Sequence, residues 1–240
     1  IAAPACSLMA IIDGNNSGRF NMIDWSSIDT VLLDMDGTLL DLHFDNYFWQ
    51  VFVPQKYAQK HGLSLIESQT ALYPRFHAQS GTLNWYCLDH WSRDLALDIV
   101  ALKHELQHLI RPRVDAMTFL QALADSNKQV WMVTNAHPDA LKLKLQSTQI
   151  APYFDHILSS HQLGKPKEHI EFWQALQQFL HFDPKRCLFI DDSEAVLTTA
   201  HAFGIGHILS IQQPDSQVAA RTGLLFPAIH HFADILPIDE

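Results

Sequence analysis

The segment VLLDMDGT spans residues 31–38 of this 240-residue chain. Its three consecutive bulky apolar residues are typical of a strand buried on both faces of a parallel sheet. The run ends abruptly at Asp34, and in open parallel sheets ligands bind just beyond the carboxyl ends of strands. Strand periodicity places Asp34 and Asp36 on one side, and Gly37 permits a sharp turn close to a ligand. We therefore expect a divalent-cation site, a carboxylate nucleophile paired with an acid/base, or both.

Four further apolar segments resemble this strand, and each ends at polar residues. They lie at 130–133, 156–158, 187–190 and 207–209. Helical patterns lie between them. Asp115 and Ser193 are placed to cap two helices, Pro138 suits a first helical turn, and Gly204 suits a helix end. Strands that alternate with helices predict an α/β fold with a doubly wound parallel sheet.

The stretch from residue 44 to 113 breaks this alternation, because its patterns are all helical. Gly62 is placed to end one helix, Ser64 and Glu67 form a capping box for the next, and Asp98 is placed to cap the last. A stripe at helical spacing indicates a further helix between them. It consists of Trp85, Leu88, Trp91 and Leu95.

This pattern predicts two units. A catalytic core is formed by residues 23–43 and 114–240, and a helical cap by residues 44–113. Because the insert follows the first strand directly, we expect it to lie over the carboxyl edge of the sheet, above Asp34. We interpret residues 1–22 as a non-native N-terminal extension.

The composition excludes several classes of function. The chain carries 16 basic and 26 acidic residues, a net charge of −10, and no basic cluster, so we expect no nucleic-acid partner. No apolar stretch is long enough to span a membrane. Cys6, Cys87 and Cys187 are spaced neither as a disulfide framework nor as a zinc motif, which favours reduced thiols and a cytoplasmic protein. His104 and His108 lack the intervening Glu of a zinc helix, and we interpret them as a solvated face.

Polar groups at several strand ends are expected to converge on one crevice. They are Asp34 and Asp36, Thr134 and Asn135, Asp191 and Asp192, and a lysine, Lys165 or Lys167. Such a set is suited to phosphoryl transfer. One carboxylate can attack phosphorus, a second can protonate the leaving oxygen and then activate water, and the Thr, Asn and Lys can bind phosphoryl oxygens. Mg²⁺ held by the carboxylates would screen the phosphate charge.

From Val31 to about residue 211, the chain resembles phosphatases of the haloacid dehalogenase (HAD) superfamily. The first family motif, DxDGT, matches residues 34–38, and the other three match Thr134, Lys167 and Asp191-Asp192, in the same order. Lys167 is favoured over Lys165 because it lies six residues before Trp173, the usual Lys-to-aromatic spacing of the family. The helical insert resembles the type-1 cap.

The resemblance implies a role for each of these residues. Asp34 is the nucleophile, and Asp36 is the general acid/base and offers its backbone carbonyl to Mg²⁺. Asp191 and Asp192 complete the metal shell, directly or through water, and which of the two touches the metal is left open. Dehalogenases usually carry Tyr at the position of Asp36, so carbon–halogen chemistry is disfavoured.

The same resemblance assigns phosphate binding to Thr134, Asn135 and Lys167. The segments 33–42, 44–49, 82–89, 134–138 and 189–195 further resemble the bacterial GMP/IMP nucleotidase branch. This narrower resemblance implies a small-molecule substrate, a purine nucleoside 5′-monophosphate. Asp45, Asn84 and Trp85 lie near predicted helix starts and are candidate substrate contacts, since an aromatic residue can stack on a base.

Other hypotheses stay open. The substrate could be another small phosphate such as a sugar phosphate or phosphoglycolate, and the chain could be a phosphomutase or a catalytically silent binding module. We expect closure of the cap to gate substrate entry, with hinges near residues 42–43 and 111–113. The sequence does not determine the oligomeric state.

Overall fold

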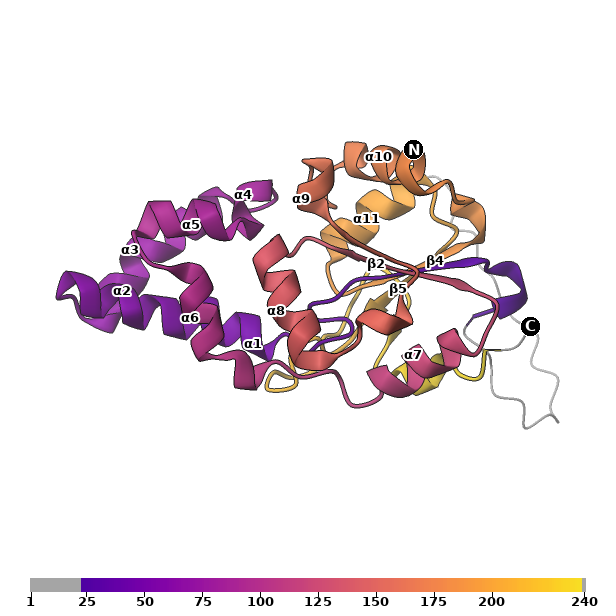
Figure 1. The fold of residues 1–240 in the computed structure, drawn as a ribbon, viewed down its shortest axis with the longest axis horizontal. Coiled ribbons are helices and arrows are strands. Elements are labelled where there is room, and N and C mark those ends of the chain that lie inside the picture. The colour runs from indigo at the N-terminus through magenta and orange to yellow at the C-terminus, as the bar shows by residue number, and fades with distance from the viewer. Residues whose placement is uncertain (1–22, 239–240) are drawn as a thin grey trace, which may run out of the picture.

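A parallel sheet of six strands forms the centre of the computed structural model, which describes residues 23–238 (Figure 1). The strands are β1 (Thr30–Leu33), β2 (Gln129–Thr134), β3 (His156–Ser159), β4 (Cys187–Asp191), β5 (His207–Ile211) and β6 (Ala228–Ile229). Their order is β3-β2-β1-β4-β5-β6, so the chain runs outward from β1 on one side and then on the other. The predicted fold class is therefore confirmed. The two residues of β6 were too few to form a sequence pattern, and the extension predicted at 1–22 lies outside the described residues.

Helices cover both faces of this sheet. Successive residues of β1 face opposite layers: Val31 and Leu33 pack in one buried cluster and Leu32 in the other. The first face is covered by α7 (Ala116–Ala124) and α8 (Pro138–Thr148), and the second by α10 (Ile170–Leu180) and α11 (Glu194–Phe203). Burial on both sides explains why the strand is an uninterrupted apolar run.

The chain between β1 and β2 forms a second lobe of helices, at the left of Figure 1. Its helices are α1 (His43–Tyr47), α2 (Val53–His61), α3 (Leu65–Ala78), α4 (Leu83–Tyr86), α5 (Leu88–Leu95) and α6 (Ile99–Glu105). As predicted, α2 ends at Gly62, which is left-handed with φ 65°. Asp98 caps α6 by accepting a hydrogen bond from the N–H of Ala101 at 2.9 Å.

Between α1 and α2 the helix widens into a π-helical turn, Phe48–Phe52. Pro54 has no N–H to donate to the carbonyl of Gln50, one turn earlier. That carbonyl instead accepts from the Tyr73 hydroxyl at 3.1 Å and the Gln69 amide at 3.4 Å. The side chains of α3 thus replace a missing backbone bond.

Two local predictions were wrong. The stripe from Trp85 to Leu95 is split at Cys87, whose Sγ accepts from the N–H of His90 at 3.4 Å and starts a new helix. Asp115 precedes α7 without capping it, because its carboxylate accepts from the distant N–H of Ala233 at 3.0 Å. The Asp115 carboxylate thus bonds to an N–H far along the chain, and the Cys87 thiol bonds to an N–H that starts a second helix.

The two segments that join the lobes lie side by side. The N–H of Asp41 donates to the carbonyl of Arg111, and that of Arg113 to the carbonyl of Leu39, both at 2.9 Å. Leu40 and Pro112 form an antiparallel bridge between them. The predicted hinges are therefore adjacent, although their motion stays a prediction.

Two sequence expectations concern the surface. His104 and His108 are exposed, as expected for a solvated helix face. From residue 23 to 238, no helix combines the length and the apolar character needed to cross a bilayer.

The capping box of α3 gives a test of this local structure. The Ser64 side chain and N–H both contact the Glu67 carboxylate, at 2.7 and 2.8 Å. We expect Ser64→Ala to lower the free energy of unfolding by about 0.5–2 kcal/mol, measured by urea denaturation. Ser80→Ala, in an exposed position just beyond the same helix, should change it by less than about 0.5 kcal/mol. Equal effects of the two substitutions would contradict the capping role.

Candidate active site

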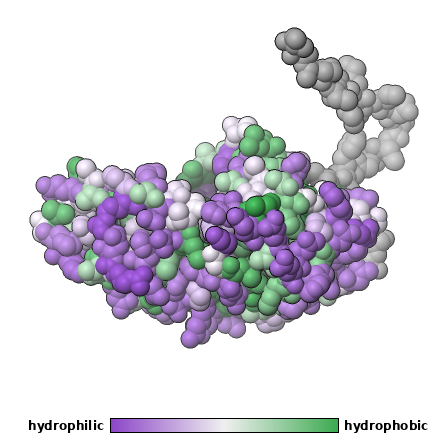
Figure 2. All heavy atoms as spheres, turned by 90° about the horizontal axis from the view of Figure 1, so that it is seen from above, coloured by the Kyte–Doolittle hydropathy of each residue, from purple (hydrophilic) through white to green (hydrophobic). Residues whose placement is uncertain are grey.

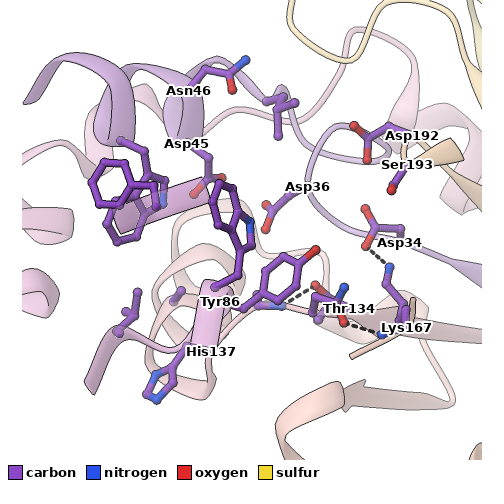
Figure 3. Close-up of a pocket in the computed structure, with 18 of the residues that line it drawn as sticks. Asp34, Asp36, Asp45, Asn46, Tyr86, Thr134, His137, Lys167, Asp192 and Ser193 are labelled. Atoms are coloured by element: carbon purple, nitrogen blue, oxygen red, sulfur yellow. Dashed lines mark hydrogen bonds and ion pairs between the residues drawn. The ribbon is translucent and has the colours of Figure 1, made fainter. Parts of the chain in front are cut away.

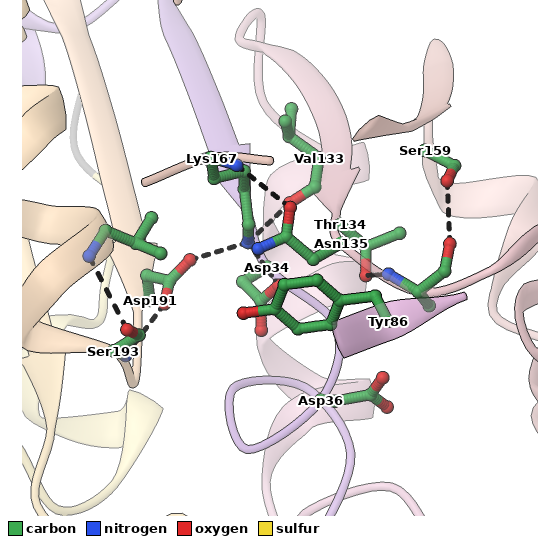
Figure 4. Close-up of polar contacts among 12 residues, drawn as sticks. Asp34, Asp36, Tyr86, Val133, Thr134, Asn135, Ser159, Lys167, Asp191 and Ser193 are labelled. Carbon is green, nitrogen blue, oxygen red and sulfur yellow. Dashed lines mark hydrogen bonds and ion pairs between the residues drawn. The ribbon is translucent and has the colours of Figure 1, made fainter. Parts of the chain in front are cut away.

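A buried lysine lies where the carboxyl ends of β1, β2 and β4 meet. The Lys167 ammonium donates to Asp34 at 2.5 Å, to Asp191 at 2.7 Å and to the carbonyl of Val133 at 3.0 Å (Figure 4). An ammonium group has three protons, so all of them are used. Lys165, by contrast, is exposed. The fold thus brings Lys167 to the predicted site and leaves Lys165 outside it.

The backbone of Lys167 is held as firmly as its side chain. Its N–H donates to the Asn135 side chain at 3.0 Å, and its carbonyl accepts from the Trp173 indole at 2.9 Å. The amide of Asn135 also donates to Glu168 at 3.0 Å. The Asn135 side chain therefore positions the lysine loop, and its direct contact with phosphate stays a prediction.

These contacts set the protonation of the cluster. Burial raises the pKa of Asp34 to about 6, against the opposing charge of Lys167. Burial alone lowers the pKa of Lys167, but the carboxylates of Asp191 and Asp34 raise it above its usual value. The lysine is therefore charged wherever the protein is folded at ordinary pH.

Three carboxylates could hold a metal ion. Asp34, Asp191 and Asp192 each offer an oxygen, and these oxygens lie within 4.8 Å of one another. Asp191 is already engaged, since its two oxygens accept from Lys167 and from the N–H of Ser193. Burial, with the charges of Asp191 and Asp34, raises the pKa of Asp192 well above its usual value.

Because Gly37 has no side chain, it leaves room for the Asp192 carboxylate. It is left-handed, with φ 82°, and a Cβ atom on it would lie 2.7 Å from the Cγ of Asp192. Only glycine allows both the turn and this close approach. The glycine singled out in the sequence thus allows the Asp192 carboxylate to lie against the turn.

Asp36 points into a second ionic cluster rather than into the first (Figure 3). Lys144 of α8 contacts Asp36 at 2.7 Å and Asp45 of the cap at 2.6 Å, and Lys103 contacts Asp45 at 2.8 Å. Burial raises the pKa of Asp36 to about 6, although Lys144 opposes the shift. Asp45 is different, because the two lysines hold its pKa well below the usual range despite burial.

Neither lysine of this second cluster was predicted from the sequence. Lys103 and Lys144 are 3 % and 2 % exposed, although each lies on a helix that contains other, exposed polar residues. Lys103 is four residues after Ile99 and Lys144 four after Ala140, on the buried faces of α6 and α8. Their spacing from these buried residues could have indicated buried lysines. Because lysines are almost never fully buried without a partner, each would then have predicted a nearby carboxylate.

One cap side chain also reaches the core. The Tyr86 hydroxyl donates to Glu168 at 2.5 Å, and burial together with the Glu168 charge raises the pKa of this tyrosine far above its usual value. Thr134 is buried at the end of β2, and its Oγ1 accepts from the N–H of Ala136 at 3.0 Å. The hydroxyl proton of Thr134 is then available to a ligand.

A cavity of about 540 Å³ connects the carboxylates to the cap. Both ionic clusters line it, together with Thr134, Asn135 and His137. Its cap side is lined by aromatic residues, namely Trp49, Tyr73, Phe76, Trp85, Tyr86 and Trp91. The face of the cap lobe seen at the left of Figure 2 is mainly hydrophilic, whereas these rings line the cavity.

The predicted substrate contacts differ in position. Asp45 and Trp85 line the cavity, whereas Asn84 is exposed and outside it. Phe48 belongs to the core of the helical bundle, because it is fully buried and does not line the cavity. Trp49 and Trp91 pack in the bundle and also line the cavity.

Comparison with known proteins agrees with this site. The sequence profile of the haloacid dehalogenase-like hydrolases matches residues 28–204. The GMP/IMP nucleotidase YrfG of Escherichia coli is 44% identical over 215 residues, which are 90% of this chain and 97% of the relative. The pyrophosphatase PpaX of Bacillus pumilus is 22% identical over 194 residues, 75% of this chain and 81% of the relative.

Solved structures share the fold. A HAD phosphatase from Thermococcus onnurineus superposes with a TM-score of 0.70 at 20% identity, over 84% of this chain and 93% of that one. The HAD-hydrolase YfnB from Bacillus subtilis, bound to magnesium, superposes with a TM-score of 0.61 at 17% identity, over 87% and 96% of the two chains.

The two neighbouring lysines give a matched test of the site. Lys167→Met leaves two buried carboxylates without their cation, so we expect the free energy of unfolding at pH 7 to fall by about 3–5 kcal/mol. Lys165→Met should change it by less than about 0.5 kcal/mol. Urea denaturation in EDTA measures both.

The loss in Lys167→Met should also depend on pH. Without the cation, Asp34 and Asp191 have pKa values above those of the unfolded chain, so the folded variant takes up protons first as the pH falls. Its deficit should therefore shrink toward pH 5. A deficit that grows in acid would contradict the ion-pair assignment.

Proposed function

Because this chain belongs to the haloacid dehalogenase-like hydrolase family and is a phosphoric monoester hydrolase, we propose that it hydrolyses purine nucleoside 5′-monophosphates through an aspartyl-phosphate. One observation carries the proposal: a single cavity runs from Asp34 to the aromatic side of the cap. Its lining offers ionic groups on the core side and aromatic rings on the cap side, which suits a phosphate joined to a base. The 44% identity to a relative named GMP/IMP nucleotidase supports the purine part.

The carboxylate cluster is suited to Mg²⁺. Oxygen ligands are those that this ion prefers, and three carboxylate oxygens converge here without a sulfur or imidazole ligand among them. We propose that Asp34, Asp192 and the backbone carbonyl of Asp36 bind it directly. Asp191 would act through water, because Lys167 and Ser193 already occupy its oxygens. Bound Mg²⁺ would supply charge neutralisation for the phosphate and the nucleophile.

Asp34 and Asp36 would carry out different steps of the reaction. A carboxylate oxygen of Asp34 attacks phosphorus, the ester P–O bond breaks, and Asp36 gives its proton to the leaving 5′-oxygen. Asp36 next takes a proton from water, whose oxygen attacks the phosphorus of the aspartyl-phosphate. This second attack releases inorganic phosphate and regenerates Asp34.

Two further groups would stabilise the transferring phosphoryl group. The free proton of Thr134 can donate to one phosphoryl oxygen, and the ammonium of Lys167 lies beside the nucleophile (Figure 4). Donors already in position where charge develops need no reorganisation during the reaction. The raised pKa of Asp36 suits a group that must first donate a proton and then accept one.

The cap side of the cavity would select the substrate. Trp49 and Trp85 offer ring faces for stacking on a base, and Asn46 and Gln50 add polar groups beside them. A sugar phosphate or phosphoglycolate would leave most of this aromatic surface without a partner, which disfavours the alternative substrates. A phosphomutase would need the cap to exclude water from the aspartyl-phosphate.

The nucleophile and the metal can be tested together. We expect phosphate release from GMP and IMP to require Mg²⁺, to stop in EDTA, and to fall at least about 10³-fold in Asp34→Asn. Asp125→Asn, an exposed carboxylate outside the cavity, should retain full activity. Undiminished turnover by Asp34→Asn would reject the mechanism.

A substrate panel tests the specificity separately. Purine and pyrimidine 5′-monophosphates, sugar phosphates and phosphoglycolate are compared by kcat/KM under the same conditions. A preference for GMP and IMP supports the proposal. Equal rates for all substrates, or a bisphosphorylated product, would replace it by one of the alternatives.

The second ionic cluster predicts a pH effect. Asp36 must be protonated to donate, so kcat/KM falls as the pH rises through its pKa. Lys144 lowers that pKa, and Lys144→Gln keeps hydrogen-bond donors while removing the charge. We expect the alkaline limb of the profile to move upward by about one pH unit or more.

Lys142→Gln is the matched control, because Lys142 is exposed on the same helix. Its profile should coincide with that of the wild type. An alkaline limb that stays in place or moves downward in Lys144→Gln would show that Lys144 does not tune Asp36.

A further inference from the structure

A second group of metal-binding side chains lies between the two lobes, separate from the carboxylates. Cys87 joins α4 to α5 in the cap, His137 precedes α8, and His161 lies in α9 (Ser160–Leu163). One potential ligand atom from each lies within 4.8 Å of the other two. The cluster draws on three distant parts of the sequence, so no motif spacing could reveal it.

The distances suit a small ion after modest side-chain movement. An ion at the centre would lie at most about 2.8 Å from each atom, compared with about 2.0–2.3 Å in zinc sites. Thiolate and imidazole are ligands that favour Zn²⁺, whereas Mg²⁺ prefers oxygen. The two sites therefore differ in the metal that they select.

One ring nitrogen of His161 lacks a hydrogen-bond partner in the described part of the chain. The Nε2 atom of His161 is buried and has no hydrogen bond within residues 23–238. Buried polar atoms in folded proteins are nearly always satisfied, so this atom calls for an explanation. A bound metal ion would supply the missing partner.

Two carboxylates complete the surroundings. Nδ1 of His137 accepts a hydrogen bond from the N–H of Asp139 at 3.3 Å, and the Asp139 carboxylate lies 3.6 Å from the same atom. Zinc binding at Nε2 places a proton on Nδ1, so the partner of Nδ1 then changes from the Asp139 N–H to the Asp139 carboxylate, which orients the ring. Asp89 lies 3.8 Å from Nε2 of the same ring and is 68% exposed, so it is free to turn toward an ion as a fourth ligand.

We propose that Cys87, His137 and His161 form a Zn²⁺ site that ties the cap to the core. Cys87 belongs to the cap and both histidines to the core, so an ion bound by all three holds the lobes together. Tyr86, the residue before the cysteine, already contacts Glu168 of the core. With the predicted gating of substrate entry by the cap, bound zinc would slow turnover.

Cobalt substitution tests the site without any use of catalysis. The full chain, reduced with a phosphine and kept in excess Mg²⁺, is titrated with Co²⁺ and then with Zn²⁺. We expect one equivalent of Co²⁺ to produce a thiolate-to-metal absorption band and the strong visible bands of four-coordinate cobalt. One equivalent of Zn²⁺ should abolish both.

Single substitutions assign the ligands. Cys87→Ser should remove the thiolate band, although Cys6 and Cys187 remain, and His161→Ala should remove the four-coordinate spectrum. Each should weaken Zn²⁺ binding by more than about 100-fold, and Asp139→Asn should weaken it by about 10–100-fold. His104→Ala, an exposed histidine of the cap, should bind as the wild type does.

Thermal melts without metal confirm that each variant is folded. A wild-type spectrum without a thiolate band, or unchanged affinity in Cys87→Ser or His161→Ala, would overturn the site. Inhibition by Zn²⁺ that is equal in the wild type and Cys87→Ser would overturn the tie between the lobes. The binding result stands whether or not the protein prefers nucleotides, so its failure is distinguishable from failure of the proposed function.

Discussion

The ammonium of Lys167 is the interaction on which the site depends. It joins a carboxylate from β1, a carboxylate from β4 and a carbonyl from β2, so three strand ends meet at one cation. Parallel strands bring their carboxyl ends to one edge, which would concentrate negative charge in a buried place. Breaking such a buried pair is costly, because the remaining charge has no solvent. The same lysine therefore holds the candidate catalytic carboxylates and stabilises the fold.

A similar device links the lobes. Lys144 of the core contacts both Asp36 and the cap residue Asp45, so the predicted acid/base and the cap belong to one ionic cluster. The Tyr86–Glu168 hydrogen bond and the Cys87, His137 and His161 group lie across the same boundary. These polar contacts therefore act with apolar packing to hold the cap in its position on the core.

Much of the fold could be predicted from local patterns. The five longer strands, the capping box at Ser64 and the ends of α2 and α11 follow from residue type and periodicity. The two errors differ in cause: Asp115 bonds to an N–H far along the chain, whereas Cys87 caps a new helix within the expected stripe. The roles of Lys103 and Lys144 depend on Asp45 and Asp36, whose proximity no local pattern encodes.

The sequence by itself determined the sheet, the helical insert and the carboxylates at the end of β1, because runs, turns and spacing act within a few residues. Tertiary structure alone decided that Lys167 pairs with Asp34 and Asp191 together and that Asn135 holds its loop. It also decided which cap aromatics line the cavity, and that one cysteine meets two histidines. These outcomes depend on burial and charge pairing between segments far apart in the chain, and such pairs form only when the lobes pack.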